Sequence, residues 1–381
     1  MTAPATTIFT VMTALAEETG AINLGQGFPD EDGPAVVIDA AVEALRAGHN
    51  QYAPLPGVPP LRRAIAAHQR ARYGIELDPD TQVQVTFGAT EALASALIAL
   101  VEPGDEVAML DPSYDSYAAV VALAGGTPRP IVLRSPAWRV EPEAVAAAIG
   151  PRTRVLLVNS PHNPTGRVLD RGELELLAAA CREHDVIAVT DEVYEHLVYD
   201  GAEHVPLCTL PGMAERTITI SSLGKTHSLT GWKIGWATGP AELVAAVRGV
   251  KQFLTFAGGT PLQHAAASAL SLDAEIGALA ATLGAKRDRL AAGLRAAGFD
   301  VLPCGGTYFL TADARPLGEP DAEALCTRLP HDAGVVAIPM SAFRAGPPDD
   351  DTRALVRFAF CKRAPVLDDA IARLRAWASG V

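Results

Sequence analysis

Residues 221–236 read SSLGKTHSLTGWKIGW and place Lys225 and Lys233 eight residues apart among serines, threonines and glycines. The chain has many arginines but only five lysines, so this pairing is unusual for its composition. One β-branched run, RTITISS (216–222), precedes the first lysine, and another, IGWATG (234–239), follows the second. The stretch therefore lies between two predicted strands, and open α/β sheets bind their ligands at strand ends.

Further short β-branched runs alternate with alanine-rich amphipathic segments along the chain. The predicted strands include VQVTF (83–87), DEVAML (105–110), RVLLVNS (154–160) and VIAVTDE (186–192). The predicted helices include TEALASALIALV (90–101), RGELELLAAACREH (171–184) and PAELVAAVRGVKQFL (240–254). Strands that alternate with helices predict an α/β fold around a mostly parallel sheet.

The alternation of short strands and helices ends after about residue 270, where a long helical stretch is followed by three short runs that we predict to be strands. These runs are GGTYFLTAD (305–313), VVAIPMS (335–341) and ALVRFAF (354–360). We expect an N-terminal arm over 1–21, a small domain built from 22–47 and 271–381, and a large domain over 48–270.

Composition excludes several classes of protein. The longest apolar run, ALASALIALV (92–101), is shorter than the ~20 residues of a membrane span, and no basic residue precedes Arg46, so we expect neither a membrane span nor a targeting peptide. The net charge of −13 disfavours nucleic-acid binding. The five cysteines form no CxxC pair, which favours free thiols over disulfides or a metal site. We expect a soluble cytoplasmic protein without a metal.

Several residues at the predicted strand ends could together bind an anion. FGATEA (87–92) ends a strand and begins a helix, so the backbone N–H groups of Ala89 and Thr90 would face a phosphate. The hydroxyls of Ser222 and Thr226 and the charge of Lys233 would complete the cradle.

Asn163, Asp191 and Tyr194 follow two neighbouring predicted strands and would converge at the same sheet edge. A carboxylate, an amide and a phenol suit a pyridine cofactor, because the carboxylate keeps a ring nitrogen protonated and the other two donate to a phenolic oxygen. Tyr114, in DPSYDSY (111–117), would offer an aromatic face to the ring.

Four motifs in this order resemble the class I/II aminotransferases, which are pyridoxal-phosphate enzymes of fold type I: SPHNPTG (160–166), DEVY (191–194), the opening stretch and VRFAF (356–360). INLGQGFPDEDGP (22–34), NQYAPLPGVPPLRRAI (50–65) and AIPMSAF (337–343) are most similar to the kynurenine/methionine-glutamine group and its N-succinyldiaminopimelate aminotransferase relatives. The resemblance implies a large domain with a mostly parallel mixed sheet flanked by helices, plus a smaller α+β domain from both chain ends.

The resemblance also implies roles for residues around pyridoxal 5'-phosphate. The implied catalytic residues are Lys225 as Schiff-base lysine and proton shuttle, Asp191 as partner of the pyridinium nitrogen, and Tyr194 beside the phenolic oxygen. The further implied cofactor ligands are Asn163 on the phenolic oxygen, Tyr114 on the ring, and Ala89, Thr90, Ser222, Lys233 and a neighbouring subunit's Tyr52 on the phosphate.

For the substrate, the resemblance implies that Arg357 binds the α-carboxylate, with Asn163 and the Gly27 backbone. Phe9 and Phe256 would line the side-chain pocket, Phe256 across a dimer interface, and Phe28 would contribute another apolar face. His227 is interpreted as a hydrogen-bonded neighbour of the site. Neither Arg248 nor Lys251 can be placed in the pocket from sequence.

The implied activity is a ping-pong transamination between an L-amino acid and a 2-oxo acid in a homodimer. The amino acid would be apolar, aromatic or long-chained, and kynurenine, methionine, glutamine and N-succinyl-diaminopimelate with glutamate all remain open. One alternative is a pyridoxal-phosphate β-lyase acting on a cysteine-like substrate, because fold alone does not fix the reaction. A ligand-sensing regulator would need an added DNA-binding module, and only about 20 residues precede INLGQG.

Overall fold

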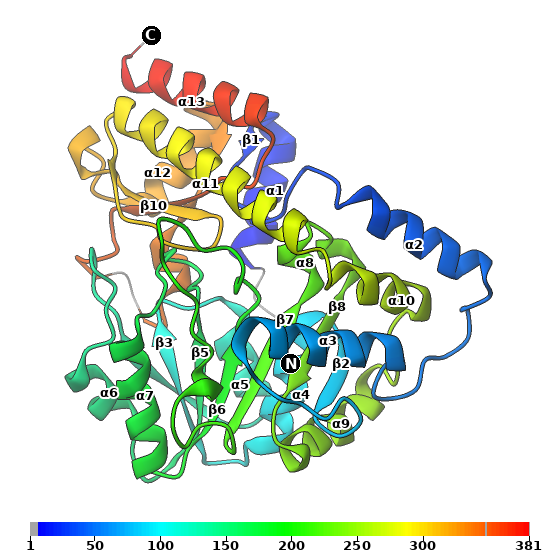
Figure 1. Ribbon diagram of the computed structural model, residues 1–381. Helices are drawn as coiled ribbons and strands as arrows, with labels where there is room; N and C mark the ends of the chain where they lie inside the picture. The colour runs from blue at the N-terminus through cyan, green and yellow to red at the C-terminus, as the bar shows by residue number, and fades with distance from the viewer. Residues whose placement is uncertain (1–6, 347–348, 381) are drawn as a thin grey trace.

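A seven-stranded mixed sheet forms the centre of the larger layer of the molecule (Figure 1), which the computed structural model describes for residues 7–346 and 349–380. The strand order is β2-β8-β7-β6-β5-β3-β4. Strand β8 is antiparallel to both neighbours, and all other neighbouring pairs are parallel. The predicted mostly parallel sheet is confirmed. The strand bounds are β2 Val83–Phe87, β3 Glu106–Asp111, β4 Thr127–Val132, β5 Thr153–Asn159, β6 Ile187–Asp191, β7 Thr217–Ser222 and β8 Ile234–Thr238.

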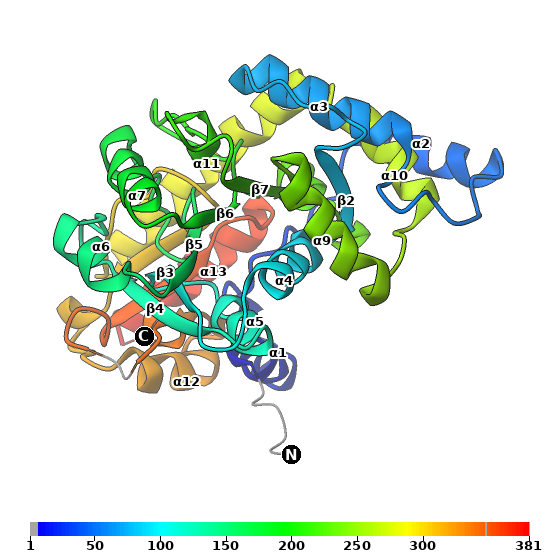
Figure 2. The same cartoon turned by 90° about the horizontal axis from the view of Figure 1, so that it is seen from below.

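Helices cover both faces of this sheet (Figure 2). In β5, Val155 and Leu157 pack into one cluster with α4 (Gly88–Leu100), α5 (Ser116–Leu123) and α9 (Ala241–Leu254), whereas Leu156 and Val158 pack into another with α6 (Pro142–Ala148) and α7 (Arg171–Glu183). Successive side chains of a strand point to opposite faces, so a strand buried on both faces needs an unbroken apolar run. RVLLVN meets that requirement.

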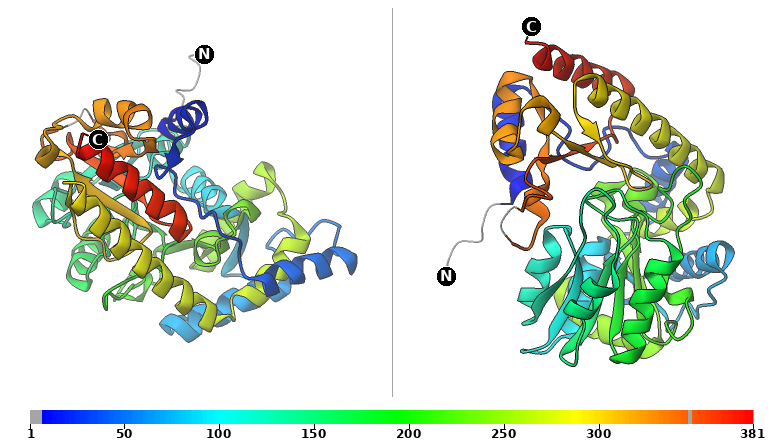
Figure 3. Two further views of the ribbon diagram at one scale, coloured as in Figure 1. Left: turned by 90° about the horizontal axis from the view of Figure 1, so that it is seen from above. Right: turned by 90° about the vertical axis from the view of Figure 1, so that its left-hand side faces the viewer.

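Segments from both chain ends build a smaller layer above the strands of the large sheet (Figure 3, right). It holds an antiparallel sheet in the order β12-β13-β10-β9 and a parallel pair in which β1 joins β11. Segments more than 300 residues apart in sequence thus share one sheet pair. The elements are α1 Ile8–Thr19, β1 Ile22–Asn23, α11 Asp273–Ala296, β9 Asp300–Val301, β10 Phe309–Asp313, α12 Ala322–Asp332, β11 Val335–Val336, β12 Ile338–Pro339, β13 Leu355–Ala359 and α13 Ala364–Ala378.

Helix α2 (Ala35–Arg46) packs differently from the sequence-based expectation. Its buried Val37 and Ala41 share an apolar cluster with Leu61 of α3 (Pro59–Tyr73), Trp236 of β8 and Ala265 of α10 (Thr260–Ala269). We therefore propose a small domain from both chain ends, as expected, but group α2 with the large domain. Residues 1–6 of the expected arm lie outside the described part of the chain.

Strand β4 was not predicted, because its sequence TPRPIV contains two prolines. Proline lacks the N–H that a central strand must donate, so it is tolerated at a sheet edge, and β4 is one of the two edge strands. The remaining short elements are α8 Leu223–Thr226, η1 Leu207–Thr209, η2 Thr230–Trp232, η3 Arg315–Leu317 and η4 Met340–Phe343.

No single helix in the described ranges, 7–346 and 349–380, has both the length and the apolar composition of a membrane span, although α10 and α11 together, bent by 83°, meet those two criteria.

Candidate active site

A pocket of about 650 Å³ lies where the strand ends of the large sheet meet the smaller layer. Register explains the convergence, because Asn159 at the end of β5 pairs with Asp191 at the end of β6, and Asp191 pairs with Ile220 of β7. Twelve of the fourteen predicted site residues line this pocket: Phe9, Gly27, Ala89, Thr90, Tyr114, Asn163, Asp191, Tyr194, Ser222, Lys225, Lys233 and Arg357. The volume is typical of small-molecule sites.

Lys225 projects its amine into the pocket from α8, the short helix that follows β7. Burial lowers the pKa of Lys225 to about 8, opposed by Cys361 and Asp191 and assisted by the cations Lys233 and Arg357. The Nζ atom donates to Tyr308 Oη at 2.8 Å. A far larger fraction of this amine than of an ordinary lysine is therefore neutral near pH 7, and only a neutral amine is nucleophilic.

Asp191 is a buried carboxylate at the end of β6. Its Oδ2 accepts a hydrogen bond from Tyr117 Oη at 2.7 Å, and its Oδ1 accepts one from the Val193 backbone N–H at 3.2 Å. Asn159 Nδ2 donates to the Asp191 backbone carbonyl at 2.8 Å. Burial raises the pKa of Asp191, and Tyr117, Val193 and Lys225 oppose that rise. A buried carboxylate favours a cationic partner, because pairing offsets its desolvation.

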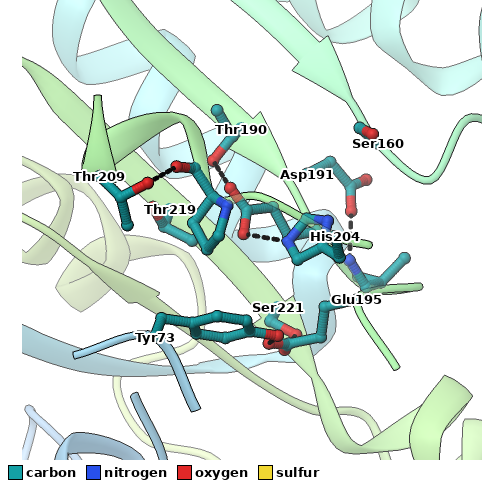
Figure 4. Close-up of polar contacts among 12 residues, drawn as sticks. Tyr73, Ser160, Thr190, Asp191, Glu195, His204, Thr209, Thr219 and Ser221 are labelled. Carbon is teal, nitrogen blue, oxygen red and sulfur yellow. Dashed lines mark hydrogen bonds and ion pairs between the residues drawn. The ribbon is translucent and has the colours of Figure 1, made fainter. Parts of the chain in front are cut away.

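A buried polar network stands behind Asp191 and fixes the turn that carries it (Figure 4). Glu192 accepts from Thr190 Oγ1 at 2.8 Å and pairs with His204 Nε2 at 2.8 Å. Three residues further on, Glu195 accepts from Tyr73 Oη at 2.7 Å and from Ser221 Oγ at 2.6 Å. These carboxylates are satisfied by protein partners, so they hold β6, β7 and α3 together rather than a pocket ligand.

The expected phosphate cradle consists of backbone at the start of α4, next to β8. A Cβ atom on Gly235 would lie 2.5 Å from Gly88 C and 2.6 Å from Ala89 N, so only glycine permits this approach. Gly88 has φ +76°, and a Cβ there would lie 3.1 Å from Lys233 Nζ. The lysine amine thus lies beside the free N–H groups of a helix N-terminus, where an anion is favoured. Ser222, at the end of β7, lines the same pocket.

Arg357 lies in β13 and is fully buried. Its Nη1 donates to Asn163 Oδ1 at 2.8 Å and its Nη2 to the Gly25 carbonyl at 2.9 Å. Its Nε has no hydrogen-bond partner among the described residues. Burial lowers the pKa of Arg357 to about 10, so the group stays charged at neutral pH. Phe309 and Phe343 lie against the guanidinium, with ring centroids 3.9 and 4.4 Å from Cζ.

Such a buried guanidinium suits a carboxylate, because among the described residues its partners are an amide and a backbone carbonyl, neither of which is charged, and its Nε has none. Asn163 is held beside the guanidinium, where it can also contact a bound carboxylate, because its backbone N–H donates to Asn159 Oδ1 at 2.7 Å. Burial raises the pKa values of Tyr194 and Tyr114, so both remain neutral phenols that donate hydrogen bonds.

Tyr52 and Phe256 do not line this pocket. They contact each other at the surface, with ring centroids 5.5 Å apart and rings nearly perpendicular. The side chain of Tyr52 is 84% exposed and that of Phe256 is 45% exposed. Within one chain they serve no site, so the roles implied for them require a second subunit. Arg248 bonds Gln84, and Lys251 bonds the Phe256 carbonyl, so neither adds a cation to the pocket.

Two sequence-based expectations near Lys225 were wrong. Thr226 does not line the pocket, and its hydroxyl bonds His196 Nδ1 at 3.0 Å instead. His227 is not hydrogen-bonded, since neither ring nitrogen has a partner in the part of the chain that is described. Burial lowers the pKa of His227 to about 4, so it packs as a neutral ring.

No sequence pattern singled out Tyr117 or Tyr308, which contact Asp191 and Lys225 respectively. Tyr117 lies in the same motif as Tyr114, but helical geometry turns its hydroxyl to Asp191. Tyr308 precedes β10 and reads as one more apolar residue of a strand. Only the packing of the smaller layer on the larger one brings its hydroxyl to Lys225.

Comparison with known proteins agrees with this geometry. Residues 19–374 match the family model described as "Aminotransferase class I and II". The chain is 54% identical to the probable N-succinyldiaminopimelate aminotransferase DapC of Mycobacterium tuberculosis, over 97% of this chain and 96% of that protein. It is 42% identical to the methionine aminotransferase of Escherichia coli, over 97% and 95% of the two chains.

The solved structure of N-succinyldiaminopimelate aminotransferase from Mycobacterium tuberculosis superposes with a TM-score of 0.96 at 54% identity, covering 98% of this chain and 97% of that chain. The buried amine, the buried carboxylate and the guanidinium that has no acidic partner among the described residues therefore belong to a fold shared along its whole length with such enzymes. The chain is an aminotransferase that belongs to the class I and II aminotransferase family.

Proposed function

We propose that the enzyme uses pyridoxal 5'-phosphate to move an amino group between an L-amino acid and a 2-oxo acid in a ping-pong reaction. One pocket carries this proposal, because it joins a buried amine of lowered pKa (Lys225), a buried carboxylate (Asp191) and a guanidinium whose Nε has no partner within residues 7–346 and 349–380 (Arg357). When bound, the cofactor would supply a reactive aldehyde and an electron-withdrawing ring.

The donor set fits that cofactor. Because residue 235 is a glycine, β8 and the start of α4 approach each other closely, and the N–H groups of Ala89 and Thr90 face the pocket. Lys233 adds a positive charge for a phosphate. Asp191, held by Tyr117, would keep a ring nitrogen protonated. Asn163 and Tyr194 would donate to a phenolic oxygen, and Tyr114 would cover one face of the ring.

Lys225 would hold the cofactor covalently and, once displaced, would move the substrate proton. Its neutral amine accepts the proton from Cα and returns it to the carbon that receives hydrogen in the product. Burial, assisted by the nearby cations Lys233 and Arg357, lowers the pKa of the amine, so it gives the proton up again readily. Arg357 would hold the α-carboxylate and thereby orient the Cα–H bond toward Lys225.

The side-chain end of the pocket supports an apolar, aromatic or long-chain substrate. Phe9 and Phe28 line it, and its only cations among the described lining residues are Lys225, Lys233 and Arg357. The likeness to proteins described as N-succinyldiaminopimelate and methionine aminotransferases makes N-succinyl-diaminopimelate and methionine the first donors to test, with 2-oxoglutarate as acceptor.

We also propose a cytoplasmic homodimer with sites at the interface. The support is the pair of exposed aromatic residues, Tyr52 and Phe256, which contact each other away from their own chain's pocket. Tyr52 would reach the phosphate of the second site, and Phe256 its side-chain pocket. Sedimentation analysis tests the dimer, and a fully active monomer would contradict it.

The proposed function is tested by a panel of amino donors and 2-oxo acceptors, read from the cofactor's absorbance in each half-reaction. Lys225→Ala should lose both the borohydride-reduced adduct at residue 225 and all turnover. The matched variant Lys233→Ala should keep the adduct but retain the cofactor weakly. Pyruvate and ammonia formed without an acceptor would instead support the β-lyase alternative.

A further inference from the structure

We propose that Tyr308 is a positioning residue for the reaction. Its hydroxyl holds the free amine of Lys225 and links that amine to the segment at Gly27. Tyr308 is fully buried and lies directly before β10. Lys225 Nζ and Tyr308 Oη are 2.8 Å apart, and the same hydroxyl contacts the Gly27 carbonyl. This assignment rests on the proposed function, in which Lys225 is the reacting amine.

The direction of both hydrogen bonds follows from the chemistry of the groups. A carbonyl can only accept, so the single hydroxyl proton of Tyr308 is donated to Gly27. The oxygen of Tyr308 is then left as an acceptor, and Lys225 must donate to it. Burial raises the pKa of Tyr308 well above its ordinary value, so the phenol stays protonated and does not act as a base.

This bond stabilises one form of Lys225 more than the other. An ammonium donates a stronger hydrogen bond than a neutral amine, so Tyr308 favours the protonated lysine that exists after the amine has taken a proton. In the neutral amine, the same bond occupies one N–H and limits rotation about Cε–Nζ. The lone pair that accepts the substrate proton is thereby held in one orientation.

Tyr308 also joins the two layers of the molecule at the pocket. A Cβ atom on Gly27 would lie 2.7 Å from a ring carbon of Tyr308 and 2.3 Å from Phe309, so glycine is needed for this contact. Tyr194 packs edge-on against Tyr308, with ring centroids 5.3 Å apart and rings at 90°. The position of the Lys225 amine is thus tied to the backbone that lines the substrate side of the pocket.

The test is the pH dependence of Lys225 reactivity in the cofactor-free chain, measured by trace acetylation and mass spectrometry of the peptide that contains it. Tyr308→Phe removes the acceptor and keeps the ring, so Lys225 should lose its proton more readily. At a pH below its titration midpoint, we expect about tenfold more reactive amine than in the unsubstituted protein. Tyr199→Phe is the matched control, because its buried hydroxyl bonds the neighbouring Thr307 carbonyl without touching Lys225.

An unchanged Lys225 profile in Tyr308→Phe overturns the proposal, and so does an equal change in Tyr199→Phe. In the cofactor-loaded enzyme, Tyr308→Phe should lower kcat about tenfold and change KM little, because Arg357 still holds the carboxylate. The acetylation measurement uses no cofactor and no substrate. It therefore reports on Tyr308 even if the donor panel rejects transamination, which keeps the two failures distinguishable.

Discussion

Replacing Arg357 by lysine tests the substrate-binding part of the site most directly. In the structure, the guanidinium spends one N–H on Asn163 and another on the Gly25 carbonyl. Arginine carries five N–H donors, so three remain, and two of them can bind both oxygens of a carboxylate. A lysine carries three donors. If two satisfy Asn163 and Gly25, at most one remains for the substrate.

Arg357→Lys therefore loses one charge-assisted hydrogen bond, a loss of about 1.5–3 kcal/mol. The expected decrease in kcat/KM for amino acids is about 10- to 150-fold. The assay is single-turnover absorbance of the cofactor, with an amino acid and with the corresponding amine that lacks the α-carboxylate. The slow reaction of the amine should be unaffected, because it makes no contact that the substitution removes.

Arg287→Lys provides the control. Arg287 is also buried, and it bonds Asp200 and the Cys304 carbonyl away from the pocket. This variant should keep kcat/KM within about twofold of the unsubstituted enzyme. The reasoning is refuted if Arg357→Lys retains full kcat/KM, or if the amine and the amino acid lose reactivity equally.

Two further predictions concern the cradle and the buried lysine. Gly235→Ala should weaken cofactor retention at least tenfold, because the new methyl group would lie 2.5 Å from Gly88 C. The control Gly231→Ala should bind the cofactor normally, because a Cβ atom at residue 231 would have no atom within 4 Å. Equal cofactor affinities of the two variants in a fluorescence titration would contradict this account. Burial lowers the pKa of Lys225 from 10.5 to about 8, so below pH 8 the unfolded chain binds that proton more tightly and the folded state is destabilised by about 3 kcal/mol. Lys225→Met should raise the free energy of unfolding of the cofactor-free chain by about that amount at pH 7. Urea titrations should show this gain in stability shrinking as the pH rises from 8 to 10.5. A gain that stays constant over that interval would argue against a depressed lysine pKa.

Much of the site was predictable because strand order and motif position locate it. Asp191 and Asn163 each follow a buried apolar strand, and parallel strands bring their ends to one sheet edge. Ala89 and Thr90 begin a helix directly after a strand, which leaves their N–H groups unpaired. These features are local, so the order of residues alone is enough to find them.

Other features depended on contacts that no local pattern encodes. Thr226 is next to Lys225 in sequence, yet only Lys225 lines the pocket, and the Thr226 hydroxyl bonds His196. Helix α2 has an ordinary amphipathic pattern that does not specify its partner, and its apolar face packs against α10. Strand β4 forms despite two prolines because it occupies a sheet edge.

Periodicity along the sequence was enough to predict the α/β class and the mostly parallel sheet, and strand-end position was enough to bring Lys225 and Asp191 to one edge, because these are properties of short segments. Arg357 was predicted only through the resemblance of VRFAF to the class I/II aminotransferases. Two contacts follow instead from the packing of the whole chain: the Tyr308 hydroxyl meets the Lys225 amine, and the Tyr117 hydroxyl donates to Asp191. Tyr308 and Lys225 lie 83 residues apart. Their contact exists because burying the apolar faces of two layers fixes the distance between them, and that distance is a property of the whole packed core.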